Sequence, residues 1–104
     1  MLKILNTILF VACENSDGLM GFYYSHNGEW NGEGTHEGYK TKMECAKTCM
    51  GKRRCIAITT YATAASDDTC IHYSNRAGLV SKWNEVPDDY DVPKSYIKCL
   101  GTYV

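Results

Sequence analysis

The sequence lacks the short motifs that mark the common enzyme classes. It contains no Gly-x-Ser-x-Gly nucleophile elbow, no His-Glu-x-x-His pair, no phosphate-binding glycine loop and no dinucleotide fingerprint. It also lacks a Cys-x2-Cys pair, and the spacing from its cysteines to His72 matches no common zinc finger. We therefore expect no catalysis, no cofactor and no metal ion.

The sequence also has no large excess of positive or of negative charge. Eleven Lys and Arg residues oppose 12 Asp and Glu residues, which gives a formal net charge of −1. This balance argues against a nucleic-acid partner bound through bulk electrostatics. Asn-x-Ser/Thr acceptors for N-glycosylation are absent, and no apolar run is long enough to span a membrane stably.

Residues 1–12, MLKILNTILFVA, carry one lysine and then a short apolar run. This pattern is typical of a secretory signal peptide, so we expect a leader over 1–12 and one secreted, extracellular domain over 13–104. Two alternatives stay open. Ile4 to Ala12 suits a buried strand equally well, and Phe10 to Cys13 has the form of a bacterial lipid-attachment box.

The segment Thr41 to Cys55, TKMECAKTCMGKRRC, predicts a capped helix. Thr41 and Glu44 have the spacing of a capping box, and Gly51 supplies a C′ stop. At about 100° per residue, five residues fall on one arc of this helix: Met43, Cys45, Ala46, Cys49 and Met50. We expect this arc, which includes both cysteines, to pack against the rest of the domain.

Strands are expected at 19–25, 55–61, 69–74 and 95–101, and the second and third of these form a hairpin. Two long irregular stretches separate them: 26–38, which is rich in Gly and Asn, and 75–93, which contains an acidic run. One helix with about five short strands gives a small α+β fold.

Six cysteines in 104 residues indicate a disulfide framework in an oxidising compartment. Two cysteines on one helix face, and one on each of two hairpin strands, can staple the helix onto the sheet and close loops of the unfolded chain. The spacing alone leaves the pairing open.

Four motifs surround these cysteines: Cys45-x3-Cys49, Cys55-x-Ala57 followed by Tyr61, Cys70-x-x-Tyr73, and Tyr96-x-Lys98-Cys99. Together they resemble the PAN/apple domain, a module of extracellular adhesion proteins, growth-factor N-terminal regions and parasite surface lectins. The resemblance extends roughly from Cys13 to Leu100.

The resemblance implies a curled antiparallel sheet with one helix across it and three bridges: Cys45 with Cys70, Cys49 with Cys55, and Cys13 with Cys99. The chain departs from the family pattern at Ile58, where phenylalanine is common, and at His72, where the family has an apolar residue. Because His72 shares a strand face with Cys70, it either hydrogen-bonds at the edge of the core or belongs to a site.

The resemblance also implies a non-catalytic module that recognises an extracellular protein or a carbohydrate, as in adhesion proteins and lectins. A basic cluster suits sulfated or carboxylated glycans, unless it is only a solvated helix edge. It comprises Lys42, Lys47, Lys52, Arg53 and Arg54, with Lys40 beside them.

A second candidate surface combines aromatic rings with short polar groups, which suit sugars, and comprises Trp30, Trp83, Asp88, Asp89 and Tyr90. Tryptophan in a small domain can equally belong to the core, and the acidic run can equally hold calcium.

Two other functions stay open. One is a structural subunit of an oligomer or extracellular assembly, linked by an unpaired thiol if Cys13 is removed, and the other is a small secreted toxin or inhibitor.

Overall fold

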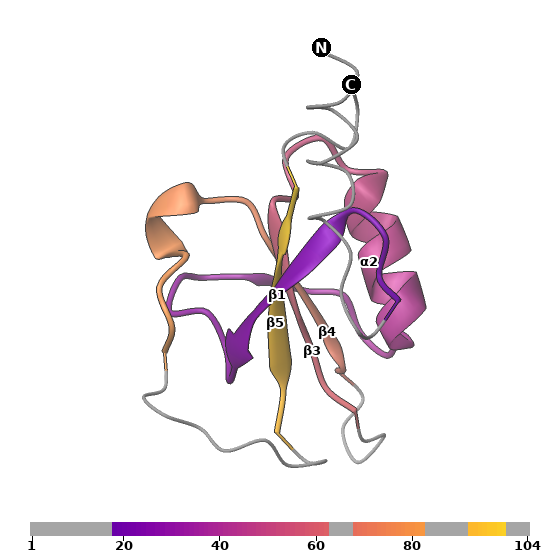
Figure 1. Cartoon of the computed structure of the whole chain (residues 1–104), viewed down its shortest axis with the longest axis horizontal. Helices are drawn as coiled ribbons and strands as arrows, with labels where there is room; N and C mark the ends of the chain where they lie inside the picture. The colour runs from indigo at the N-terminus through magenta and orange to yellow at the C-terminus, as the bar shows by residue number, and fades with distance from the viewer. Residues whose placement is uncertain (1–17, 63–67, 83–91, 100–104) are drawn as a thin grey trace, which may run out of the picture.

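A computed structural model of the chain describes residues 18–62, 68–82 and 92–99. The predicted leader at 1–12 lies outside these ranges. The described part has the expected α+β class (Figure 1). Its elements are β1 (Phe22–Asn27), β2 (Thr35–His36), α2 (Lys42–Met50), β3 (Ala57–Thr60), β4 (Cys70–Tyr73), the 3-10 helix η1 (Arg76–Gly78) and β5 (Lys94–Lys98).

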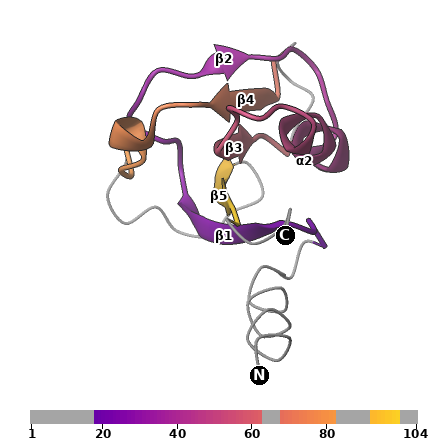
Figure 2. The ribbon, with the colours of Figure 1, turned by 90° about the horizontal axis from the view of Figure 1, so that it is seen from above.

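The five strands form one antiparallel sheet in the order β1-β5-β3-β4-β2. The predicted hairpin is confirmed, since Ala57 of β3 lies opposite Tyr73 of β4, and Thr60 opposite Cys70. The closing strand, β5, lies inside the sheet between β1 and β3. Figure 2 shows this order, with α2 on one side of the sheet and η1 on the other.

Each face of the sheet has its own core. The face toward α2 buries Phe22, Ile58 and Tyr96 with the cysteines of the helix. The opposite face buries a second group: Trp30, Ala57, Ile71 and Tyr73, with Ile56, Tyr61, Leu79 and Ile97 packed against it. Because successive side chains of a strand point to opposite faces, neighbours such as Ala57 and Ile58 serve different cores.

The helix α2 begins as the sequence predicts. The Thr41 hydroxyl accepts a hydrogen bond from the Glu44 N–H, and the Glu44 carboxylate accepts one from the Thr41 N–H, which completes the capping box. The predicted end of the helix at Gly51 is confirmed, although Gly51 does not adopt the left-handed conformation common at such ends. Gly51 follows the last helical residue, but its φ of −77° is right-handed and its N–H still donates to the Lys47 carbonyl.

The predicted buried arc of α2 is too wide. Cys45, Ala46 and Cys49 are buried, whereas Met43 is 62% exposed and Met50 is 38% exposed. At about 100° per residue, both methionines lie at the same margin of the arc. The disulfides hold the opposite margin, which carries the cysteines, against the sheet.

All four predicted strands differ from their predicted bounds, and one strand was missed. β3 and β4 lie inside the predicted 55–61 and 69–74 and are shorter. β1 begins and ends later than the predicted 19–25, and β5 ends before the predicted 101. The missed strand is β2, in the stretch expected to be a loop, where Thr35 pairs with His72 and His36 with Ile71. A strand of two residues is too short to show a period in the sequence.

Candidate functional site

Two disulfides fix α2 to the rest of the domain. Cys45 is bonded to Cys70 in β4, and Cys49 is bonded to Cys55, just before β3. Two of the three pairings implied by the family resemblance are thereby confirmed. The predicted bridge between Cys13 and Cys99 cannot be placed, because Cys13 lies outside the described residues.

The turn that follows α2 is exposed but anchored. Residues 51–54 are exposed, and the Cys49–Cys55 bridge closes the loop of which they are part. The Lys98 ammonium group, reaching from β5, donates to the carbonyls of Cys49 (2.8 Å) and Lys52 (3.1 Å). These carbonyls already accept from the Lys52 and Cys55 N–H groups, so the ammonium adds a second hydrogen bond to each and ties the turn to β5. Burial lowers the pKa of Lys98.

A cavity of about 570 Å³ opens beside this turn. Its walls come from four parts of the chain: β1, the turn after α2, the η1 segment and the end of β5. Most of the lining residues are apolar, and the charged ones are all basic. They are Tyr23, Met50, Arg53, Cys55, Ile56, Arg76, Leu79, Ile97, Lys98 and Cys99.

The two arginines of the cavity, Arg53 and Arg76, pair with no acidic residue of the described ranges. Both side chains belong to exposed residues. Guanidinium groups without a nearby carboxylate create a positive electrostatic potential at the edge of this apolar cavity. The cavity therefore favours anionic groups.

The predicted basic cluster extends along α2 and into the turn that follows it. The nine-residue helix is about 14 Å long, and Lys42 lies at its start while Lys52, Arg53 and Arg54 follow its end. Lys52 forms an ion pair with Glu37, at 2.8 Å. Of the predicted cluster, Arg53 lines the cavity, and the exposed Arg54 is its neighbour in the chain.

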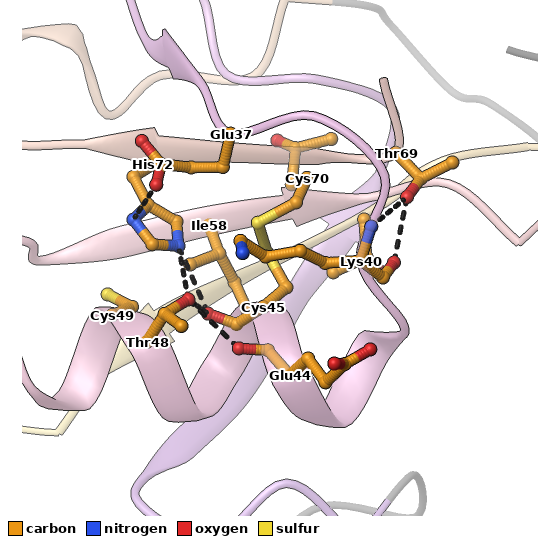
Figure 3. The surroundings of a disulfide bond; sticks show 12 residues. Glu37, Lys40, Glu44, Cys45, Thr48, Cys49, Ile58, Thr69, Cys70 and His72 are labelled. Atoms are coloured by element: carbon orange, nitrogen blue, oxygen red, sulfur yellow. Dashed lines mark hydrogen bonds and ion pairs between the residues drawn. A yellow bond between two sulfur atoms is a disulfide. The ribbon is translucent and has the colours of Figure 1, made fainter. Parts of the chain in front are cut away.

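The buried His72 connects β4 to the helix (Figure 3). Its Nε2 lies 3.0 Å from the Cys45 carbonyl and 3.3 Å from the Thr48 hydroxyl. Because a carbonyl oxygen only accepts, Nε2 of the neutral ring carries the proton. His72 thus follows the first of its two expected roles, that of a hydrogen-bonded residue at the core.

The other ring nitrogen of His72 faces two charged groups. Nδ1 lies 3.5 Å from the Lys52 ammonium and 3.9 Å from the Glu37 carboxylate. The hydrogen bond from Lys52 lowers the pKa of Glu37. Burial lowers the pKa of His72, and it outweighs the opposing effects of the Cys45 carbonyl and the Glu37 charge.

The residues that most resemble a metal site are Cys45, Cys70 and His72. Their potential ligand atoms lie within 4.8 Å of one another. The two sulfur atoms are bonded to each other, however, and a disulfide supplies no thiolate ligand. In this oxidised state the role of the cluster is structural.

The aromatic candidate surface is largely outside the described residues. Trp83, Asp88, Asp89 and Tyr90 fall in the range 83–91, which the structure does not describe. Trp30 is described, and its predicted role as an exposed ligand contact needs correction. It is 4% exposed, packs in the second core and donates its indole N–H to the Ile58 carbonyl.

Sequence reasoning missed the wall of the cavity formed by Arg76 and Leu79. Arg76 and Leu79 belong to the stretch expected to be irregular, where they show no periodic pattern. The nearest local signal is Asn75, whose side chain accepts from the Ala77 N–H and starts η1. That signal predicts a turn, but it does not indicate that the turn faces the end of β5.

No family model matches this chain, and neither a characterised protein nor a solved structure resembling it was found. In the described ranges, no helix has the length and apolar character needed to cross a bilayer.

Proposed function

We propose that the chain is a non-catalytic extracellular binding module of the PAN/apple type, which recognises a protein or carbohydrate ligand through the loops that flank its helix. One observation carries this proposal: an exposed basic turn is held rigidly, by a disulfide and by Lys98, at the edge of a cavity. A rigid surface of this kind loses little conformational entropy when a ligand binds.

The two disulfides support an extracellular setting. Structural disulfides persist in oxidising compartments and are rare in the cytosol. Each cysteine of the two bridges is buried, which is typical of structural rather than catalytic cysteines. The apolar segment at 1–12 is consistent with this setting, as a secretory leader.

The described surface favours acidic ligands over neutral sugars. Trp30, the described tryptophan, is buried and offers no ring face to a sugar. The exposed cations Lys47, Arg53 and Arg54 instead suit sulfated or carboxylated chains, or an acidic surface of a protein.

A glycan array, probed with the full chain at low and high salt, tests the carbohydrate branch. We expect binding to sulfated or carboxylated glycans that weakens as salt screens the charges. The double variant Arg53→Gln/Arg54→Gln should lose most of this binding. Lys82→Gln is the matched control, because Lys82 pairs with Glu29 and does not line the cavity.

Each other outcome of the array changes the proposal in a defined way. Salt-insensitive binding to neutral sugars would move the site away from the basic turn. An array that stays blank at both salt concentrations would remove the carbohydrate branch and leave recognition of a protein.

A further inference from the structure

We propose that the cavity beside the basic turn binds a small amphipathic anion, a molecule with an apolar body and one carboxylate, sulfonate or sulfate group. This inference rests on the proposed function and names the ligand chemistry of the same site. It follows from the size of the cavity, from its walls and from its unpaired arginines.

The cavity has the size and walls of a small-molecule site. Its volume of about 570 Å³ falls inside the range of roughly 300 to 1,000 Å³ that ligand pockets commonly span. Ile56, Leu79 and Ile97 lie against the second core and are only partly buried. Their remaining apolar surface would leave water when the body of a ligand covers it, which favours binding.

The charged part of the ligand is indicated by the basic side chains. Arg53 and Arg76 come from different segments and line the same cavity, and neither has an acidic partner in the described ranges. A guanidinium group can donate two parallel hydrogen bonds to one carboxylate or sulfate. Lys98 adds positive charge, although its ammonium already donates to two carbonyls.

The lining argues against two other kinds of ligand. Among the described lining residues, a cation would meet three basic ones and no acidic one. A neutral sugar would find, in the same set, one aromatic ring, Tyr23, and no carboxylate to accept its hydroxyl groups. An apolar molecule without charge would gain from the walls but would leave the arginines unpaired.

A pair of fluorescent probes separates the apolar contribution from the charged one. Anilinonaphthalene sulfonate carries a sulfonate on its aromatic rings, whereas N-phenyl naphthylamine has the same rings and no charge. We expect the full chain to bind the sulfonate at one saturable site and the neutral probe about tenfold or more weakly, because charge-assisted hydrogen bonds are lost.

Single variants locate the site. Arg53→Gln and Arg76→Gln should each weaken sulfonate binding by about tenfold and leave binding of the neutral probe unchanged. Arg54→Gln is the matched control, because Arg54 is the adjacent exposed arginine and does not line the cavity. Urea unfolding of each variant verifies that the probe reports on the folded protein.

A competition experiment needs no variant. Octanoate should displace the sulfonate probe from the wild-type chain, and octanol at the same concentration should displace much less. Equal displacement by both, equal binding of both probes, or no saturable binding would overturn the proposal. It would also fail if Arg54→Gln weakened binding as much as Arg53→Gln, since the charge would then be diffuse.

The result is distinguishable from the test of the proposed function. A blank array together with saturable, octanoate-sensitive probe binding would reject glycan recognition and retain the anion-binding cavity. Array binding that depends on Arg53 and Arg54, with no probe binding, would retain the module and reject the cavity as its ligand site.

Discussion

The imidazole of His72 is buried in an environment that disfavours a positive charge. Its ring is 4% exposed, and Nε2 is held by the Cys45 carbonyl. A proton added at Nδ1 would face the Lys52 ammonium at 3.5 Å, with Glu37 slightly farther away at 3.9 Å. Burial therefore keeps the folded ring neutral and lowers the pKa of His72.

This lowered pKa predicts a loss of stability as the pH falls. The unfolded chain binds a proton at His72 near pH 6.5, and the folded chain binds it at lower pH, so the free energy of unfolding decreases as the pH falls below about 6.5. Urea unfolding between about pH 7.5 and pH 5.5 measures the slope. The lowered pKa of Glu37 acts in a separate window, below about pH 4.5.

The variant His72→Gln separates this contribution from others. Glutamine retains an N–H donor for the Cys45 carbonyl but does not titrate, so the variant should show a flatter dependence of stability on pH over the same range. Its absolute stability is not the readout. A slope equal to that of the wild type would place the pH sensitivity at other groups.

At the scale of elements, the wall of the cavity that carries Arg76 depends on a close contact between two segments, at Gly32 in one and Gly78 in the other. The Gly32 N–H donates to the Gly78 carbonyl, and the neighbouring Asn31 N–H donates to the Val80 carbonyl. A Cβ atom added at Gly32 would lie 2.6 Å from the Gly78 Cα atom, closer than real contacts allow. The backbones can approach this closely because both residues lack a side chain.

We therefore expect Gly32→Ala to destabilise the domain by about 1 to 3 kcal/mol, the usual cost of overpacking. It should also weaken binding of the sulfonate probe, because the η1 segment must shift. Gly51→Ala is the control: its nearest neighbour would be 3.6 Å away, and its φ of −77° suits any residue. Equal unfolding free energies for the two variants would contradict this account of the loop contact.

Local patterns predicted the elements better than they predicted the site. The helix was identifiable because Thr41 and Glu44 satisfy each other within one turn, and the β3–β4 hairpin because its strands are adjacent in the chain. The insertion of β5 between β1 and β3 depends on contacts over long separations. Arg53 and Arg76 are also far apart in the sequence, so no local pattern predicts that they line one cavity.

At the scale of the whole molecule, the two bridges restrain different amounts of chain. The Cys45–Cys70 bridge spans 25 residues and joins α2 to β4, whereas the Cys49–Cys55 bridge spans 6 and closes the basic turn. In the chain-entropy account, a longer closed loop gives a larger stabilisation. The first bridge should therefore contribute more to global stability, and the second more to the shape of the candidate site.

Paired alanine variants test this division. With those loop lengths, chain entropy predicts a loss of about 3.5 kcal/mol for Cys45→Ala/Cys70→Ala and about 2.2 kcal/mol for Cys49→Ala/Cys55→Ala, measured by urea unfolding. The second variant should nevertheless bind the sulfonate probe more weakly than the first, under conditions where both are folded, because it releases the turn that holds Arg53. A reversed order of stabilities would contradict the loop-closure argument, and equal probe binding would mean that Lys98 alone is sufficient to hold the turn.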